Sequence, residues 1–349
     1  MIVFDRETKK GRLLDPRADY AEKVVESEVR TDPLTGQTGR ICHFAFDIAP
    51  PADLSQLVDG SAATCPFCPP HVSTITPRYP ADFLAEGRLE RGQAVLFPNL
   101  FPYDDISAIA VISAAHFHAM DDIPAAVIED GLGIARDFYR RVEAESVADQ
   151  DSYGIVTWNY MPPAGASQVH PHMQVIHTTS PGNGLRRHLD AAETWRQAHG
   201  LAYAEALVEA EQQAGERWIG ESGSVLWLAP FVPTGILGDC IALFPGRATV
   251  TELSDAEITD FAAGLQAALK GYAARGLWSF NLVFQPDRAG TDAGRHWLTA
   301  RLVPRLYINP ALHVTDVAYM QLILEERFAM TYPEDNAAQL RAAWAAGAG

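Results

Sequence analysis

Short apolar runs bounded by turn-forming residues recur along the chain and predict β-strands. In the first half these runs lie at 94–99, 108–113, 153–159 and 169–177. Residues 123–142 lie between the second and third runs and have the apolar spacing of a helix. In the second half the strand-like runs lie at 225–230, 240–245, 281–285 and 297–303. A helix is predicted here too, because Ser254 and Glu257 form a capping-box pattern and helical spacing continues to about Arg275.

The two halves share one order of elements: strand, strand, helix, strand, strand. This order predicts an α+β chain with a duplicated domain. The predicted boundaries are 1–180 for the N-terminal half, 181–220 for a linker that is partly helical over 191–214, and 221–349 for the C-terminal half. Residues 1–60 are polar and are expected to be irregular, apart from a turn at Asp32-Pro33-Leu34-Thr35-Gly36.

Composition narrows the classes of protein. The chain has 349 residues and a formal net charge of −17, which argues against general nucleic-acid binding and against an anionic membrane surface. No apolar run reaches the ~18 residues that would indicate a membrane span, and the first ten residues lack a signal-peptide layout. Four cysteines are too few for a disulfide scaffold in a chain this long. These features predict a globular protein of a reducing cytoplasm.

The most informative stretch runs from Asn159 to Val175. It ends in an alternation of His170, His172 and Gln174 with apolar residues between them. On a strand, residues two apart point to the same face, so two imidazoles and an amide are expected to line one side. A run of small and turn-forming residues at 162–167 precedes them and allows close approach of an anion to the backbone. A phosphate held there would lie beside an imidazole, as nucleophilic phosphoryl chemistry requires.

Cys65 and Cys68 form a Cys-x-x-Cys pair, which suits either a tetrahedral metal or a redox couple. The partners decide between these readings. His116 and His118 follow the apolar run at 108–113, and His170 begins the central alternation. Two cysteines with two histidines are the donor set of a structural zinc site. Such a site, fully ligated, has no open position for substrate.

The segment Ala-Gly-Ala-Ser-x-x-His-Pro-His-x-Gln at 164–174 resembles the active-site motif of the galactose-1-phosphate uridylyltransferase family, in the histidine-triad superfamily. It is also similar to that of the diadenosine tetraphosphate phosphorylases. The resemblance implies a duplicated histidine-triad-like fold, with antiparallel sheets flanked by helices. It also implies a homodimer whose sites are completed by the partner chain.

Carried over by position, the resemblance implies that His172 attacks the α-phosphorus of a nucleotide sugar and forms a covalent nucleotidyl-histidine. Gln174 stands where hydrolytic members of the superfamily have a third histidine. An amide donates a hydrogen bond to a phosphoryl oxygen but cannot act as a general acid, which favours transfer over hydrolysis. Ser167 is expected to donate to the incoming phosphate, and Asn159 to orient the phosphates.

The resemblance also assigns binding residues. Asn99 matches a base-contacting asparagine, although a plain turn explains it equally well, and Gly165 keeps the substrate loop tight. Zinc is implied at Cys65, Cys68, His118 and His170, with His116 competing for the third place.

The second half lacks the corresponding chemistry. Gln285, Thr299 and Arg301 occupy the places where some uridylyltransferases hold a second metal, so no second metal is predicted. Arg301 and Arg305 suit either a phosphate or structural ion pairs. Gln321 and Arg327 stand where sugar-contacting residues are expected, so galactose is not a secure substrate.

The leading prediction is a nucleotidyltransferase that acts on a nucleotide sugar and a phosphorylated acceptor, a sugar 1-phosphate. A phosphorylase, with orthophosphate as acceptor, uses the same histidine chemistry and is the first alternative. A nucleotide-binding regulator without turnover is the second, and the intact His172, Gln174 and Ser167 argue against it. A thiol enzyme based on Cys65 and Cys68 is the third.

Overall fold

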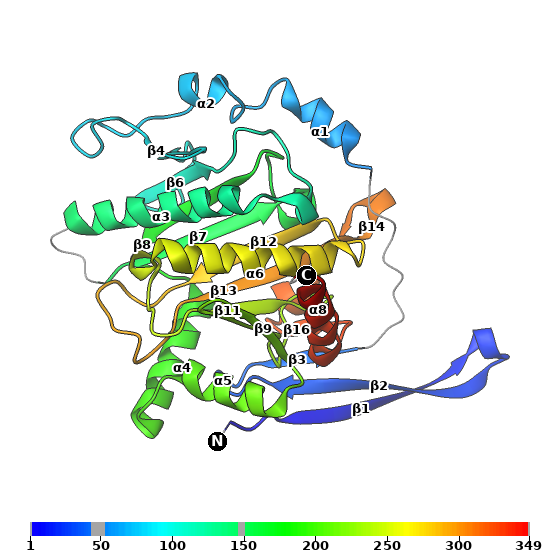
Figure 1. The fold of residues 1–349 in the computed structure, drawn as a ribbon. Helices are drawn as coiled ribbons and strands as arrows, with labels where there is room; N and C mark the ends of the chain where they lie inside the picture. The colour runs from blue at the N-terminus through cyan, green and yellow to red at the C-terminus, as the bar shows by residue number, and fades with distance from the viewer. Residues whose placement is uncertain (1, 43–52, 146–150, 348–349) are drawn as a thin grey trace.

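A ten-stranded sheet forms the centre of the molecule (Figure 1). The structure is a computed structural model that describes residues 2–42, 53–145 and 151–347. The strands, in their order across the sheet, are β4 (Leu89–Arg91), β5 (Ala94–Pro98), β6 (Ile106–Val111), β8 (His172–Thr178), β7 (Tyr153–Tyr160), β12 (Ser279–Gln285), β13 (Thr299–Arg305), β11 (Cys240–Leu243), β10 (Val225–Leu228) and β9 (Trp218–Ser222). All neighbouring strands of this sheet pair antiparallel.

The order of strands repeats outward from the middle of the sheet. From the β7–β12 pair at the centre, the first half continues through β8, β6, β5 and β4, and the second through β13, β11, β10 and β9. Along the chain, each half consists of three strands, a long helix and two further strands. The two long helices are α3 (Ala125–Glu145) and α6 (Asp255–Ala273). The predicted α+β fold with duplicated antiparallel halves is confirmed, and the two halves form one continuous sheet.

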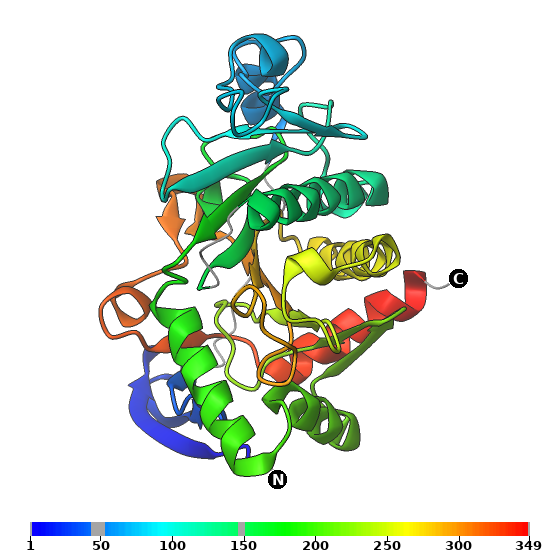
Figure 2. The same cartoon turned by 90° about the vertical axis from the view of Figure 1, so that its left-hand side faces the viewer.

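The helices α3, α6 and α8 (Pro333–Gly347) lie side by side against one face of the sheet (Figure 2). The predicted capping box of α6 is present: the Ser254 Oγ accepts from the Glu257 N–H at 3.2 Å, and a Glu257 carboxylate oxygen accepts from the Ser254 N–H at 2.8 Å. Such a cap stabilises a helix by about 1 kcal/mol.

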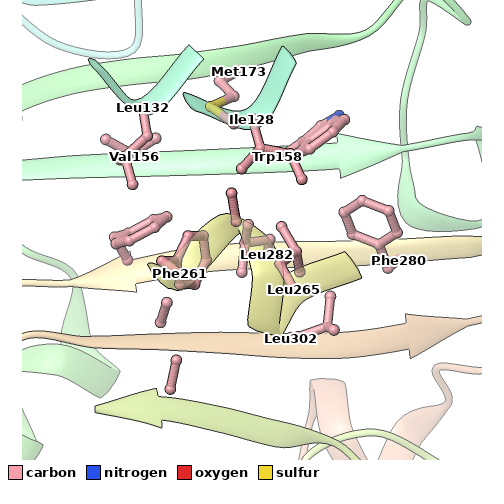
Figure 3. Packing of buried hydrophobic residues seen from close by; sticks show 14 of the residues in the cluster. Ile128, Leu132, Val156, Trp158, Met173, Phe261, Leu265, Phe280, Leu282 and Leu302 are labelled. Atoms are coloured by element: carbon pink, nitrogen blue, oxygen red, sulfur yellow. The ribbon is translucent and has the colours of Figure 1, made fainter. Parts of the chain in front are cut away.

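One hydrophobic core joins the two halves under these helices. Ile128 and Leu132 of α3 and Phe261 and Leu265 of α6 pack on alternate residues of the central strands, among them Trp158 and Leu282 (Figure 3). Because side chains alternate along a strand, every second residue of these strands faces the core and the others face away. The second face of the sheet is the one turned away from α3, α6 and α8, and it carries the polar residues of the candidate site.

The strand register places those polar residues in rows. Gln174 of β8 pairs with Thr157 of β7, which pairs with Val283 of β12, which pairs with Arg301 of β13. Along β7 and β12 the next residues on the same face are Asn159 and Asn281, which pair with each other. With about 4.8 Å between strands, this row runs about 14 Å across the sheet from Gln174 to Arg301.

The expectation that residues 1–60 are irregular is wrong for the described residues. β1 (Arg6–Asp15) and β2 (Ala21–Thr31) form a long hairpin that projects from the molecule (Figure 1), and β3 (Thr38–Ile41) and β16 (Arg327–Ala329) complete a four-stranded sheet. Nearly all residues of β1 are exposed, so the hairpin needs no apolar alternation and gives no strand signal in the sequence. The predicted turn at 32–36 is present, with Gly36 at a φ of 70°.

A buried ion pair ties the hairpin to the body. Arg30 is 1% exposed, and its two Nη atoms donate to the Glu334 carboxylate at 2.8 and 3.1 Å. Arg217 donates to the same carboxylate at 2.9 Å. Because a buried charge without a partner is costly, these contacts fix the base of the hairpin against α8.

The remaining elements cover the edges and the second face. The predicted linker is more helical than expected. It contains two helices, and the first of them begins at Asn183 instead of at residue 191. The helices and strands not yet named are α1 (Ser55–Ala62), α2 (His71–Thr74), α4 (Asn183–His199), α5 (Tyr203–Ala214), β14 (Tyr307–Asn309), β15 (Val314–Thr315) and α7 (Tyr319–Leu322), with 3₁₀ turns η1 (Pro16–Ala18), η2 (Met120–Asp122), η3 (Pro162–Ala164), η4 (Val250–Glu252) and η5 (Pro310–Leu312). Within the described residues no helix combines the length and apolar character needed to cross a bilayer.

α4 places His188 beside His296, with 5.0 Å between the ring centroids. Burial and the neighbouring His296 lower the pKa of His188 to about 3. The unfolded chain therefore binds a proton at this residue below pH 6.5 when the folded chain does not, and the folded state loses stability as the pH falls toward 3. The contribution lost between pH 7 and pH 5 is about 2 kcal/mol.

His188→Gln is expected to reduce the difference in unfolding free energy between these pH values, measured by urea denaturation. His199→Gln, an exposed change on the same helix, serves as control, and an equal reduction in both variants would contradict the assignment.

Candidate active site and metal centre

His172 begins β8 on the second face of the sheet. Its Nδ1 lies 2.8 Å from the carbonyl oxygen of His170, which can only accept a hydrogen bond. The proton is therefore on Nδ1, and Nε2 carries the lone pair. The side chain is 8% exposed, and burial lowers the pKa of His172. These features give a neutral imidazole of one defined tautomer, which is the reactive form of a histidine nucleophile.

The loop before this strand is tightly folded. Met161 has a φ of 69°, an unusual conformation for a residue other than glycine, and its side chain is buried in the core. The turn η3 follows, and Gly165 ends it at a φ of 84°. The N–H of Gly165 donates to the Pro162 carbonyl at 2.8 Å, so Gly165 contributes shape to the loop while its donor is used within the turn. A side chain at Gly165 would be strained, which explains the glycine.

Asn159 faces this loop from β7, and it is held by a residue that sequence reasoning missed. The Asn281 side chain of β12 donates from Nδ2 to Asn159 Oδ1 at 2.7 Å and to the carbonyl of Ala164 at 2.9 Å. Arg305 in turn donates to Asn281 Oδ1 at 2.6 Å and is ion-paired with Asp316. Asn159 Oδ1 is thus occupied, and its Nδ2 is the group left to donate to a ligand. The second half therefore positions the loop and the amide of the first half.

The other predicted substrate residues lie as follows. Gln174 is on the same face of β8 as His172, two residues along the strand. Ser167 is exposed at the end of the loop. Asn99 uses Oδ1 to accept from the Phe101 N–H at 3.0 Å, which is the turn interaction that the sequence allowed as an alternative. His177, on the opposite face of β8, packs against Tyr139 with 6.4 Å between ring centroids. The roles of Gln174, Ser167, Asn99 and Gly165 remain predictions.

Two thiols and two imidazoles form a cluster next to His172. Its members are Cys65, Cys68, His116 and His170, and their nearest sulfur and nitrogen atoms all lie within 4.8 Å of one another. Cys68 Sγ is 3.2 Å from His116 Nδ1 and 3.4 Å from His170 Nδ1, and Cys65 Sγ is 3.6 Å from His170 Nδ1. A tetrahedral zinc ion with bonds of about 2.3 Å to sulfur and 2.05 Å to nitrogen separates such atoms by about 3.5 Å. The cluster has the dimensions of a zinc site.

The hydrogen bonds around the cluster also fit a metal. His170 Nε2 donates to the Ser113 carbonyl at 2.8 Å, which leaves Nδ1 with its lone pair toward the thiols. Ser61 uses its hydroxyl proton on the Leu57 carbonyl, so His116 Nε2 donates to Ser61 Oγ at 3.0 Å and its Nδ1 also faces the thiols. Burial lowers the pKa of His170 to about 4, while burial and Cys65 raise the pKa of Cys68 to about 11. Neutral imidazoles are ready ligands, and a bound cation would stabilise the thiolates.

The choice of His118 over His116 as third ligand is wrong in this structure. β6 ends at Val111, and the chain bends at residues 114–116, so the strand alternation used to favour His118 does not continue. The bend turns His116 toward Cys68. His118 Nε2 lies 2.8 Å from Ser113 Oγ, and Tyr160 donates to the His118 carbonyl at 2.6 Å. His118 therefore braces the loop that carries His116.

Phe67, between the two cysteines, is a further residue that sequence reasoning missed. Its ring centroid lies 5.2 Å from that of His172 and 6.2 Å from that of His170. The loop that carries the two cysteines thus also places an apolar ring against His172. The position of Phe67 between two candidate metal ligands was the available signal, since a loop that shares a metal with His170 must pass close to it.

A cavity of about 340 Å³ adjoins Asn281 on the second face of the sheet. Arg301, Arg305, Asp316 and Gln321 line it. Arg301 is ion-paired with Asp239 and Arg305 with Asp316, so the structural alternative predicted for both arginines is present. Gln321, expected near the sugar, also borders this cavity. Its Nε2 donates to the carbonyl oxygen of Asp316, in the same segment, at 3.3 Å.

Comparison with known proteins gives the fold and leaves the activity open. No family model matches this chain. An uncharacterized protein of Archaeoglobus fulgidus is 28% identical over 345 residues, which cover 98% of this chain and 99% of that protein. The name of that relative assigns no function, so the solved structures carry the comparison.

Three solved structures are similar over nearly their whole length. An ADP-glucose phosphorylase from Arabidopsis thaliana with bound ADP-glucose has a TM-score of 0.68 at 18% identity and covers 90% of this chain and 98% of its own. A GalT-like protein from the same plant has a TM-score of 0.66 at 19% identity, with the same coverage of 90% and 98%. A uridylyltransferase has a TM-score of 0.65 at 21% identity and covers 91% of this chain and 98% of its own. The homodimer and the cytoplasmic location stay predictions. The chain has the fold of the uridylyltransferases, as the resemblance predicted.

Proposed function

We propose that this chain is a nucleotidyltransferase that moves a nucleoside monophosphate from a nucleotide sugar to a sugar 1-phosphate through a covalent intermediate on His172. The observation that carries the proposal is the hydrogen bond from His172 Nδ1 to the His170 carbonyl. It fixes the tautomer in which Nε2 is the nucleophile, beside a loop and an amide that are suited to hold a phosphate.

The reaction has two displacement steps. The Nε2 lone pair forms a bond to the α-phosphorus, and the bond from that phosphorus to the bridging oxygen breaks, so that the sugar 1-phosphate leaves with the electron pair. A phosphate oxygen of the acceptor then attacks the same phosphorus, and the phosphorus–nitrogen bond breaks to restore the neutral imidazole. The Nδ1 proton stays on the imidazole throughout, and its hydrogen bond to the His170 carbonyl stabilises the charged adduct.

Neighbouring residues supply hydrogen bonds to the phosphoryl oxygens. The amides of Gln174 and Asn159 and the hydroxyl of Ser167 donate to charge that develops on the α-phosphate. None of them offers a general acid, and none is needed, because the sugar 1-phosphate leaves in the first step as a phosphate anion and the His172 imidazole leaves in the second step as a neutral base. Cys65, Cys68, His116 and His170 would hold zinc, and a bound ion would keep His170 in the position from which its carbonyl orients His172.

Intact-protein mass spectrometry tests the proposal. The zinc-loaded protein is mixed with UDP-glucose, ADP-glucose and GDP-mannose in turn, without acceptor. The expected result is an acid-labile mass increase of one nucleoside monophosphate with one of these donors. Adding glucose 1-phosphate or orthophosphate to the adduct then distinguishes transferase from phosphorylase by which of them discharges it. Folded, zinc-loaded protein that forms no adduct with any donor would refute the covalent mechanism and favour the binding-protein alternative.

The two hydrogen bonds that Asn281 donates, to Asn159 Oδ1 and to the Ala164 carbonyl, form a bridge between β7 and the phosphate loop. This Asn281 bridge is expected to control the rate of the first step. Asn281→Ala removes the donor to Asn159 Oδ1 and to the Ala164 carbonyl. Because a misplaced phosphate-binding group lowers the rate of the chemical step, adduct formation on His172 is expected to slow roughly 10- to 100-fold, as measured by rapid-quench kinetics. Zinc content should not change.

Asn281→Asp provides the matched comparison. A carboxylate keeps the shape and still accepts from Arg305, but it cannot donate to the two oxygens that Asn281 serves. The Asp variant should therefore be at least as slow as the Ala variant. Wild-type rates in Asn281→Asp would show that the bridge is not what orients the loop.

A further inference from the structure

A second cavity, of about 230 Å³, lies on the C-terminal half of the sheet. Strands β11 to β13 form its floor, α4 and α5 form a wall, and the turn at 32–36 and β16 close it. Neither His172 nor any of the four cluster residues lines it. The cavity is therefore distinct from His172 and the metal-site cluster, and the two steps proposed above assign no role to the residues that line it.

Three arginines line this cavity, and Arg301 and Arg327 are the two that are paired with Asp239 and Asp32; the third, Arg295, is paired with Asp287. Arg301 Nη1 donates to Asp239 Oδ2 at 2.6 Å and to Thr234 Oγ1 at 2.9 Å. Arg327 Nη1 lies 3.5 Å from Asp32 Oδ2 and 3.2 Å from the Val232 carbonyl. Both arginines line the cavity, whereas Asp239 and Asp32 do not. The cavity wall thus presents hydrogen-bond donors, and the acids orient them from outside.

Part of each of these two guanidinium groups remains available. In the part of the chain that the structure describes, the contacts of Arg301 and Arg327 use Nη1, so Nε and Nη2 of each can donate to a ligand. Burial and, next, the charge of Arg301 lower the pKa of Arg327. An oxyanion between the two groups would offset this repulsion, and paired N–H donors match its geometry.

An apolar wall adjoins the arginines, since Ile241 pairs directly with Arg301 across the sheet. Ala204 and Leu207 of α5 and Ile241 and Leu243 of β11 line it. His188, which also borders the cavity, is neutral at pH 7 because its pKa is lowered to about 3. A ligand that fits this wall has an uncharged body as well as a charged head, which favours an organic anion over a free inorganic ion.

We propose that this cavity binds a small organic anion, whose phosphate or carboxylate head lies between Arg301 and Arg327 and whose body lies against the apolar wall. The ligand site does not include His172 or the residues proposed to hold the nucleotide phosphate. Arg301 and Gln285 also border the cavity beside Asn281, so an occupied site would adjoin the bridge that holds the phosphate loop.

Isothermal titration calorimetry of the full chain with glycerol 3-phosphate and with malonate tests the proposal. Saturable binding of one or both is expected, and the probe that binds identifies the head group as phosphate or carboxylate. His172→Ala should bind as tightly as wild type. Arg327→Gln should bind roughly 10- to 100-fold more weakly, since it removes a charge-assisted donor. Arg288→Gln, which removes an arginine outside the cavity, is the matched control and should bind normally.

Gln37→Glu keeps the proposal testable if Arg327→Gln does not fold. The Gln37 side chain lines the cavity, and in the described residues only its backbone makes hydrogen bonds, so the change adds a negative charge without removing a contact. Anion binding should again weaken at least tenfold by charge repulsion. Absence of saturable binding of either probe would overturn the proposal. So would binding that survives in Arg327→Gln and Gln37→Glu but is lost in His172→Ala, since it would place the anion beside His172.

Discussion

His172→Ala is expected to form no nucleotidyl adduct and to lose about 10⁴-fold or more in turnover, the scale seen when a covalent nucleophile is removed. Neither imidazole of the adjacent cluster can replace it. His170 has Nε2 committed to the Ser113 carbonyl and Nδ1 directed at the thiols. His116 is held in the same way by Ser61 and Cys68. The measurement is the adduct mass, together with the rate of nucleotide transfer under saturating donor.

His177→Gln is the matched control for this variant. His177 lies on the same strand, five residues along, but on the face that packs against the helices. Its replacement should leave the rate of adduct formation within a few-fold of wild type once the fold is confirmed by circular dichroism. An adduct that persists in His172→Ala and disappears in His177→Gln would place the nucleophile on the other face and refute the mechanism.

The face that carries His172 and Gln174 could be predicted because it depends on local geometry. A strand alternates its side chains whatever its neighbours are, so His172 and Gln174 had to share a face once the strand was assigned. The duplicated fold was also predictable, since both halves repeat one order of apolar runs. The same rule misplaced the third metal ligand: alternation holds only within a strand, and β6 ends before either histidine.

The contacts that complete the site could not be predicted, because they join residues far apart in sequence. Asn281 is separated from Asn159 by 122 residues, and only the central β7–β12 pairing brings them together. The N-terminal hairpin shows the same limit. Its strands carry charged residues on both exposed faces, and the anchor at its base, Arg30 with Glu334, spans 304 residues. Neither case leaves a periodic signal in the chain.

Loss of a metal ligand should have the second large effect. His116→Gln or Cys68→Ser is expected to lower bound zinc from about one per chain to near none, measured by atomic emission after dialysis. Zinc that binds only the folded state stabilises it by about 4 kcal/mol at a free concentration 1,000 times its Kd. These variants, and wild type treated with a chelator, should therefore melt several degrees lower than the zinc-loaded protein. Adduct formation should slow as well, because His170 orients His172 from within the cluster.

His118→Gln separates the two candidate histidines. His118 bonds to Ser113 Oγ at 2.8 Å and lies outside the cluster, so its replacement removes one hydrogen bond worth about 1 kcal/mol and should leave zinc content unchanged. If His118→Gln lost the metal and His116→Gln kept it, the assignment made from the structure would be reversed. A third outcome bears on the thiols themselves. Cysteine variants that keep full zinc but lose all activity would show that Cys65 and Cys68 act as a redox pair, because a bracing metal site cannot lose its ligands and keep its ion.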